Sequence, residues 1–313
     1  MGNSNGKKIQ DIIAEKKSSN KSFDVIVERA MPKLFLICAT ISILTTIGIV
    51  FTLLFETITF FNHVSIIEFI TSKEWYPMHS DPSFGILPLV SGTLLIALIA
   101  MVIAIPMGLG AAIYLSEYAS MKTRKIIKPV LEVLAGIPTI VYGFFALTFV
   151  TPLLKNFIPD LSIYNALSPG IVVGIMIIPM IASLSEDAMS SVPRSIREGA
   201  YAMGSTRFEV AIKVVLPAAL SGVMASFVLA ISRAIGETMI VTVAGGANPV
   251  ATLDVTSAIQ TMTAYIVQVS LGDAGYGTTV YYSIYAVGMT LFVFTLIMNL
   301  LAFFISRRFR EEY

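Results

Sequence analysis

The sequence is poor in charged residues, and this shortage excludes most water-soluble folds. Charged residues make up 13% of its 313 residues, whereas the hydrophobic set reaches 56%. A typical soluble domain has about 25% charged residues. So few charges cannot cover the surface of a water-soluble protein of this length. We therefore expect most of the exterior to face membrane lipid.

Cysteine and histidine are also scarce. Cys38 is the single cysteine, which excludes an intramolecular disulfide and a cysteine-cluster metal site. The two histidines, His63 and His79, leave little for a zinc site or for histidine-based catalysis. The net charge of +1 excludes a strongly basic nucleic-acid binder. We expect no catalytic residues, no metal, no cofactor of its own and no nucleic-acid partner.

Long apolar runs predict an all-α integral membrane protein with six transmembrane helices. A bilayer core ~30 Å thick requires about 20 apolar residues in a helix. Six stretches qualify, at about residues 34–55, 86–115, 129–154, 169–184, 218–244 and 281–305. The segment 251–271 could be counted as a seventh span. We interpret it instead as a helix at the outer face, because a seventh span would place the basic C-terminal tail outside.

The distribution of basic residues predicts the orientation and the domain organisation. Lysine and arginine are concentrated in residues 1–33, in the loops after the second and fourth spans, and in the C-terminal tail. Only Lys73 and Lys155 lie in the opposite loops. Cytoplasmic loops carry an excess of these residues, so both termini are expected in the cytoplasm. Residues 1–33 would form a cytosolic basic arm, and residues 34–313 the six-span domain.

Proline occurs inside three successive predicted spans, as Pro106, Pro138 and Pro179. A proline within a helix removes a backbone hydrogen bond and kinks or breaks it. In a membrane such breaks are tolerated where the freed backbone lines a cavity or is buried in protein. We therefore predict helix breaks at these positions. The alternative is that each kink only improves packing.

The cytoplasmic loop at residues 191–217 predicts a helical elbow. Met203-Gly204-Ser205 has the composition of a turn, and Thr206 followed three residues later by Glu209 forms a capping box that starts a new helix. An elbow of this length between two spans suits docking into the groove of a partner. A solvated or interfacial pair of helices is the alternative.

The fifth span carries charge, which is costly inside a membrane and therefore needs partners. Arg233 and Glu237 are four residues apart, the spacing of neighbours on one helix face. Arginine presents a planar fork that matches the oxygens of an oxyanion. We expect Arg233, Glu237, Ser232 and Thr238 to form a polar station for an anionic solute. An ion pair that only locks the helix bundle is the alternative.

The residues of the elbow resemble the EAA signature of ABC-importer permeases. Glu198-Gly199-Ala200, then Gly204, then Leu216-Pro217 match its spacing, with glycine in place of alanine at 199. Position 214 also departs from it, with valine in place of isoleucine. In that family the elbow is the coupling helix, which sits in a cleft of a separate ATPase subunit. The resemblance therefore assigns these six residues to ATPase coupling and implies the type I importer permease fold.

Other segments resemble the PstC-type phosphate permeases of that family. They are Arg233 to Met239, Leu134 to Gly143, Glu74 to Pro77 and Phe84 to Pro88. The sister PstA-type subunits share several of them, but the outer loop with its W-x-P segment and the long basic arm favour PstC. The resemblance implies phosphate as substrate and a bacterial or archaeal cytoplasmic membrane. The implied partners are a PstA-like second permease, a PstB-like ATPase dimer that binds the ATP, and a PstS-like extracytoplasmic phosphate-binding protein.

Three other function classes are the alternatives. An ABC permease for another oxyanion, such as sulfate or molybdate, shares the elbow. An uncoupled channel or transporter would explain Arg233 but not the elbow. An aspartyl intramembrane protease requires aspartates within spans, but the candidates all lie in expected loops: Asp160, Asp187, Asp254 and Asp273. A zinc-dependent protease requires an H-E-x-x-H motif, and neither histidine lies in a span. The only Gly-Lys pair, Gly6-Lys7, lacks the spacing of an ATP-binding P-loop.

Overall fold

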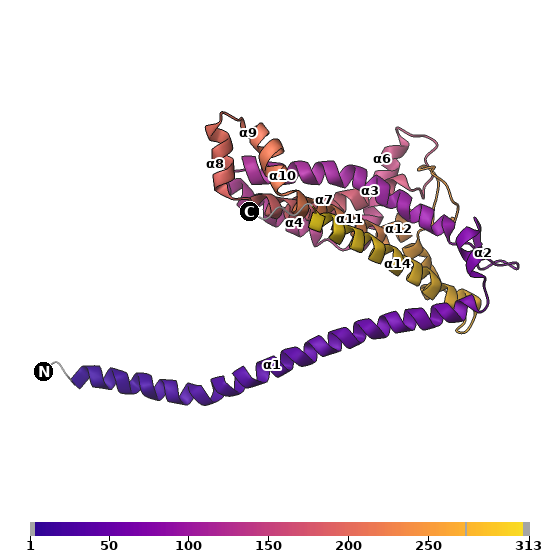
Figure 1. Ribbon diagram of the computed structural model, residues 1–313. Helices are drawn as coiled ribbons and strands as arrows, with labels where there is room; N and C mark the ends of the chain where they lie inside the picture. Colours follow the sequence, from indigo (N-terminus) through magenta and orange to yellow (C-terminus); the bar gives the residue numbers. More distant parts are fainter. Residues whose placement is uncertain (1–3, 273, 309–313) are drawn as a thin grey trace. The chain divides into compact units, whose positions relative to one another are not determined.

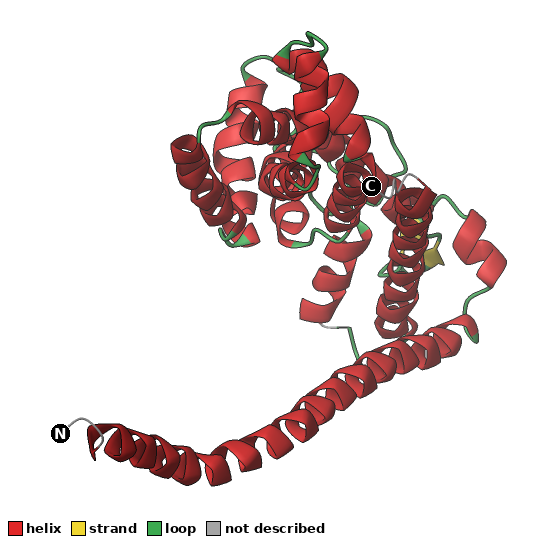
Figure 2. Cartoon of the chain, turned by 60° about the vertical axis from the view of Figure 1, so that its left-hand side comes forward, coloured by secondary structure: helices red, strands yellow, loops and turns green. Residues whose placement is uncertain are grey.

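The computed structural model describes residues 4–272 and 274–308, and Figure 2 shows that they are mostly helical, with one short pair of strands. The chain divides into two units, Met1–Phe55 and Glu56–Tyr313. Each unit is described by itself.

The N-terminal unit is helical from Ser4 onward. Helix α1 runs over Ser4–Phe61 and continues past Pro32. Its backbone therefore continues through the basic arm into the first apolar run without a break. Large apolar side chains between Leu34 and Phe55 are exposed. The hydroxyl of Thr40 donates to the carbonyl of Leu36 at 2.7 Å, so that this polar group is satisfied within the helix. Such a surface suits lipid rather than water.

The second unit follows α1 with helices of very different lengths, three of them π-helical segments marked η. The elements are α2 (Ile66–Thr71), β1 (Trp75–Tyr76), β2 (Ser83–Phe84), α3 (Leu87–Ile113), η1 (Tyr114–Tyr118), α4 (Met121–Ala135), α5 (Thr139–Phe145), η2 (Ala146–Val150), α6 (Thr151–Lys155), α7 (Leu167–Ser190), α8 (Arg194–Ala202), α9 (Arg207–Glu209), η3 (Val210–Val215), α10 (Leu216–Ala218), α11 (Leu220–Ile235), α12 (Met239–Ala244), α13 (Met262–Leu271) and α14 (Thr279–Arg308).

The helices support six membrane spans within the described residues. Four are single helices, at Ala30–Phe61, Leu87–Tyr118, Leu167–Ser190 and Thr279–Leu301. Two more are bent pairs: α4 with the helix from Thr139 to Lys155, bent by 85°, and the helix from Arg207 to Ala218 with α11, bent by 75°. Counting each bent pair as one span gives the six that the apolar runs predict. The expected all-α membrane fold is confirmed, and the orientation of the termini stays a prediction.

The three prolines do not behave alike. Pro138 lies between α4 and α5, where the third span bends by 85°. Pro106 lies inside α3 and Pro179 inside α7, and both helices continue past their proline. The expectation of helix breaks at Pro106 and Pro179 is therefore wrong. A single missing hydrogen bond is tolerated there because the two helices pack closely against each other around both prolines, with Gly108 against Ile181 and Gly174 against Ala100.

The packing of α3 against α7 forms the centre of the second unit, and Figure 1 shows the two helices side by side. Small residues allow this close approach. A Cβ added at Gly108 would lie 2.7 Å from the Cβ of Ile181, and one added at Gly174 would lie 2.9 Å from the carbonyl oxygen of Ala100. Small residues at helix interfaces are the usual means of packing helices inside membranes.

An aromatic cluster stabilises the segment between α1 and α3. The antiparallel strands β1 and β2 pair Trp75 with Phe84. The Trp75 ring packs edge-on against Tyr265 of α13, with centroids 4.8 Å apart, and is only 1% exposed. This tryptophan, whose isolation in an outer loop suggests an interfacial position, is instead a core residue. Of the apolar segment 251–271, the structure makes only Met262–Leu271 helical.

Candidate translocation and coupling sites

Arg233 lies at a cavity between three helices of the second unit. The cavity has a volume of 430 Å³ and is lined by residues of α4, α7 and α11. These are Lys128, Leu131, Glu132, Ala135, Met176, Pro179, Met180, Ser183, Leu184 and Arg233. The walls are thus mostly apolar, with charged side chains at a few points. Such a lining fits a polar solute that is held at only a few positions.

The guanidinium of Arg233 lacks a carboxylate partner among the residues that the structure describes. Its nearest polar contact is Nη2 to the sulfur of Met176 at 4.0 Å. Ion pairs within 4.0 Å do form elsewhere in the unit, but none involves Arg233. An arginine in an apolar span that is unpaired within the described part of its chain is available to an anion or to another subunit.

Arg233 and Glu237 are not neighbours on one helix face, and this expectation is wrong. Helix α11 ends at Ile235, the chain turns, and α12 begins at Met239. Glu237 is 7% exposed, and its Oε1 accepts a hydrogen bond from the backbone N–H of Ile240 at 3.3 Å. The carboxylate therefore caps the start of α12 instead of orienting the arginine.

Ser232 and Thr238 also lie outside the cavity lining. The hydroxyl of Ser232 donates to Oδ1 of Asn299 in α14 at 2.8 Å. The hydroxyl of Thr238 donates to the carbonyl of Gly236 at 3.1 Å, inside the turn between the helices. Of the four predicted pathway residues, only Arg233 lines the cavity. Glu237 and Thr238 form hydrogen bonds at the break in the fifth span, and Ser232 bonds to α14. A role for these three in the pathway stays a prediction.

The elbow has the predicted two-helix form. Helix α8 (Arg194–Ala202) ends in a turn at Gly204, whose φ of +86° favours glycine, and α9 starts at Arg207. The capping box is present: Oγ1 of Thr206 accepts from the N–H of Glu209 at 3.3 Å, and the Glu209 carboxylate accepts from the N–H of Thr206 at 3.0 Å. The prediction of this local structure is confirmed.

The capping box also sets the charge state of Glu209. Hydrogen bonds from the Thr206 backbone, from the Lys213 ammonium and from the Thr206 hydroxyl lower the pKa of Glu209 from 4.5 to about 2. The carboxylate that holds the first turn of α9 therefore stays ionised at an acidic pH at which an ordinary glutamate is protonated.

The exposed tip of the elbow presents apolar side chains. Met203 is 87% exposed and Phe208 is 65% exposed, with Tyr201 beside them in sequence. On the opposite side of α8, Ile196 and Ala200 pack against a core of α3, α7 and η3 residues. The elbow is thus anchored on one face and free on the other. Helix periodicity alone predicts Met203 on the anchored face, whereas the structure places it at the open tip.

The residues of the EAA-like segment differ in their exposure. Glu198, Gly199, Gly204 and Pro217 are exposed, and Ala200 and Leu216 are half-buried. A Cβ added at Gly199 or Gly204 would meet nothing of this chain within 4 Å. The open space at both glycines is consistent with a partner surface, so the coupling role of this segment stays a prediction supported by its exposure.

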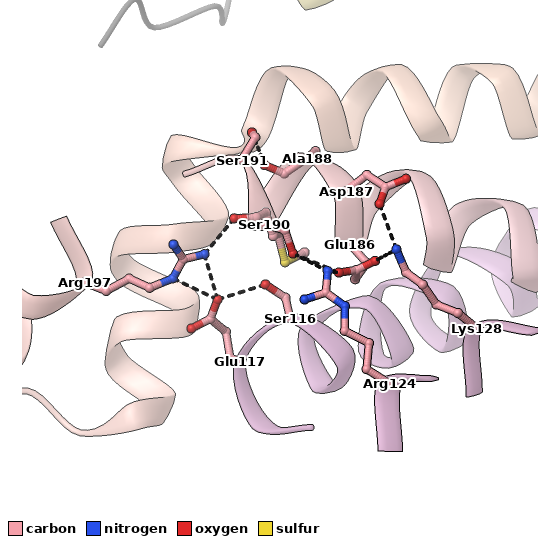
Figure 3. A network of polar contacts seen from close by, with 11 residues as sticks. Ser116, Glu117, Arg124, Lys128, Glu186, Asp187, Ala188, Ser190, Ser191 and Arg197 are labelled. Atoms are coloured by element: carbon pink, nitrogen blue, oxygen red, sulfur yellow. Dashed lines mark hydrogen bonds and ion pairs between the residues drawn. The ribbon is translucent and has the colours of Figure 1, made fainter. Parts of the chain in front are cut away.

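A polar network beneath the elbow was not foreseen from the sequence (Figure 3). The Glu117 carboxylate in η1 pairs with Arg197 of α8 at 3.1 Å, and Ser116 donates to the same carboxylate at 2.9 Å. Both ionic side chains are well buried, at 5% exposed for Glu117 and 15% for Arg197. Partners 80 residues apart in sequence are invisible to motif spacing.

The same network continues along α7 to α4. Glu186 of α7 has a side chain with no exposed surface and is paired with Arg124 and Lys128. The hydroxyl of Ser190 donates to Glu186 at 2.8 Å and accepts from Arg124 at 2.8 Å. A buried carboxylate needs such compensation. The general rule that acidic residues at the end of an apolar run require cationic partners could have pointed to Glu117 and Glu186.

Comparisons with known proteins place these features in a family. Residues 104–311 match the binding-protein-dependent transport system inner membrane component. The chain is 36% identical over 273 residues to the probable ABC transporter permease protein YqgH of Bacillus subtilis (strain 168), covering 87% of this chain and 88% of that protein. It is 37% identical over 195 residues to the phosphate transport system permease protein PstC of Xylella fastidiosa (strain 9a5c). That match covers 56% of this chain and 59% of the relative, less than two thirds of the relative's length.

Solved structures agree at the level of the fold. A bacterial alginate ABC transporter, in complex with an alginate pentasaccharide-bound periplasmic protein, aligns with a TM-score of 0.63 at 17% identity. The alignment covers 91% of this chain and 97% of that one. The MetNI methionine ABC transporter aligns with a TM-score of 0.53 at 18% identity, covering 72% of this chain and 95% of that one. The expected resemblance to PstC-type permeases is confirmed, and the chain belongs to the binding-protein-dependent transport system inner membrane components, as a multi-pass permease subunit of the ABC-transporter type.

Proposed function

We propose that this chain is the PstC-like permease subunit of an ATP-driven phosphate importer in a bacterial or archaeal cytoplasmic membrane. The observation that carries the proposal is the guanidinium of Arg233, which lines a cavity of 430 Å³ and has no carboxylate partner in the described part of the chain. An arginine with free donors suits a tetrahedral oxyanion. Several relatives are named phosphate transport system permease proteins, which supports phosphate as that oxyanion.

The proposal includes three partners. A second, PstA-like permease would supply the other wall of the pathway, facing the exposed surface of Arg233. A PstB-like ATPase dimer would bind the ATP and receive the elbow tip, so that this chain needs no cofactor and no ATP site of its own. A PstS-like binding protein would deliver phosphate from outside. Glu198, Gly199, Ala200, Gly204, Leu216 and Pro217 would contact the ATPase.

Reconstitution tests the substrate. The four proteins are assembled in proteoliposomes, with the binding protein on the side of the membrane opposite the ATPase. ATP hydrolysis is then measured. Phosphate should stimulate ATP hydrolysis, and labelled phosphate should be transported across the membrane. Sulfate and molybdate at the same concentration should neither stimulate hydrolysis nor be transported. If sulfate or molybdate stimulated ATP hydrolysis and phosphate did not, the chain would instead be a permease for another oxyanion.

A further inference from the structure

We propose that the Glu117–Arg197 ion pair is the joint through which movement of α8 reaches the helices that line the Arg233 cavity. The proposal rests on the proposed function, because it takes α8 as part of the element that an ATPase displaces. Both residues are positioning residues, since neither lines the cavity. The argument depends on which elements the pair connects, on its burial and on what lies beyond it.

Arg197 connects α8 to two other elements at once. Its Nε and Nη2 donate to Oε1 of Glu117 in η1 at 3.2 and 3.1 Å. Nη2 also donates to the carbonyl of Met189 at 2.7 Å, and Nη1 donates to the carbonyl of Val192. Figure 3 shows the guanidinium between α8 and the end of α7. One planar side chain thus fixes α8 to η1 and to the cytoplasmic end of α7.

Burial gives this contact a fixed geometry. The side chains of Glu117 and Arg197 are 5% and 15% exposed, so that solvent and salt screen the pair little. Exposed ion pairs are mobile and contribute little. Separating the charges of this pair would leave a buried carboxylate uncompensated, which is costly. When α8 is displaced, η1 and the end of α7 should therefore move with it, because breaking the contacts of Arg197 costs more free energy.

The elements beyond the joint are the walls of the cavity. Helix α7 is linked to α4 by Glu186, which pairs with Arg124 and Lys128. Both helices line the cavity that contains Arg233. The contacts therefore run without interruption from the elbow, through Arg197, along α7 and α4, to the proposed oxyanion site. A continuous chain of contacts does not by itself establish coupling. The coupling between ATP hydrolysis and transport therefore has to be measured.

The measurement is the number of phosphate ions moved per ATP hydrolysed by the complete importer in proteoliposomes. Glu117→Gln keeps the shape of the side chain and removes its charge. We expect the ATPase to remain bound in this variant and the transport ratio to fall about fivefold or more, the scale of common coupling energies. Lys155→Gln is the control, because Lys155 is an exposed basic residue at the end of α6 that lies outside both the elbow and the cavity lining. Its ratio should equal that of the wild type.

A second variant distinguishes a specific role of the Glu117–Arg197 pair in coupling from an unspecific loss of protein stability. Arg197→Lys keeps the charge but cannot bond Glu117 and two carbonyls together. If the two residues act as one joint, combining Arg197→Lys with Glu117→Gln lowers the ratio no further than the stronger single variant. Additive losses, or a wild-type ratio in Glu117→Gln, would overturn the proposal. If Glu117→Gln does not assemble, Glu117→Asp, which keeps the charge but shortens its reach, is measured in the same way.

The two proposals fail in different ways. A wild-type importer that hydrolyses ATP without moving phosphate contradicts the proposed function. A wild-type importer that moves phosphate, together with variants that move as much per ATP, contradicts only the joint.

Discussion

Gly108 of α3 lies directly against Ile181 of α7, where an added Cβ would come within 2.7 Å of the Ile181 Cβ and Cγ2. Gly108→Ala should therefore push α3 and α7 apart and lower the stability of the purified protein in detergent by about 1–3 kcal/mol, the usual cost of overpacking. Thermal unfolding followed by fluorescence measures the change.

Gly110, two residues along the same helix, is the control. An added Cβ there meets nothing within 4 Å, and replacing a helical glycine by alanine stabilises by roughly 0.5–1 kcal/mol. Gly110→Ala should be neutral or stabilising. Equal unfolding temperatures for the two alanine variants would contradict the close packing at Gly108.

Arg233→Gln should strongly reduce phosphate uptake while the complex still assembles. The variant removes the charge at the cavity, and a hydrogen bond to a charged group contributes about 1.5–3 kcal/mol, so uptake should fall by roughly tenfold or more. Uptake of labelled phosphate into cells that lack their own importer measures this loss, with assembly checked by co-purification.

Lys155→Gln serves as the matched control for Arg233→Gln. Lys155 is an exposed basic residue at the end of α6 and does not line the cavity, so its replacement should leave uptake unchanged. Normal uptake by an assembled Arg233→Gln importer would exclude Arg233 from the phosphate pathway.

Gly204→Glu should weaken ATPase binding at the elbow. The position is exposed with a φ of +86°, and an added Cβ meets nothing of this chain. Any clash must therefore come from a partner or from backbone strain. Gly204→Asn separates these causes, because asparagine tolerates a positive φ. Pull-down of the ATPase should fall strongly for glutamate and less for asparagine, and unchanged pull-down with glutamate would place the docking surface elsewhere.

Glu209 predicts a pH dependence confined to the elbow. Its pKa of about 2 lies below the ordinary 4.5, so the stabilisation it gives to α9 is fully present above pH 4.5 and is lost as the pH falls from there toward 2. The protection factors of the amides near Thr206, which compare measured hydrogen exchange with the intrinsic rate at each pH, should fall over that window in the wild type. Thr206→Ala, which removes the hydroxyl partner, should raise the pKa of Glu209 measured by NMR. An unshifted pKa in that variant would exclude a contribution from the hydroxyl.

The local features could be predicted from the sequence, because each is fixed by residues a few positions apart. The apolar runs predict the six spans, and the Thr206–Glu209 spacing predicts the capping box that the structure contains. The features that failed depend on tertiary structure. Glycine at 236 follows the last residue of α11, so the spacing rule that relates Arg233 to Glu237 has no continuous helix on which to act.

The ion pairs beneath the elbow show the same limit. Glu117 and Arg197 come from segments 80 residues apart, and no repeat or motif relates them. Proline is a further case: its effect depends on whether neighbouring helices support the backbone, so Pro106 and Pro179 lie in continuous helices and Pro138 at a bend.

The pairing of Glu186 with Arg124 and Lys128 has a consequence for biogenesis. A polypeptide emerges from the ribosome N-terminus first, so both cations have been synthesised before the carboxylate that needs them. When α7 is inserted, the Glu186 carboxylate can be desolvated while its cationic partners are already present on α4. The order of the residues along the chain thus spares the nascent protein the insertion of an isolated buried charge.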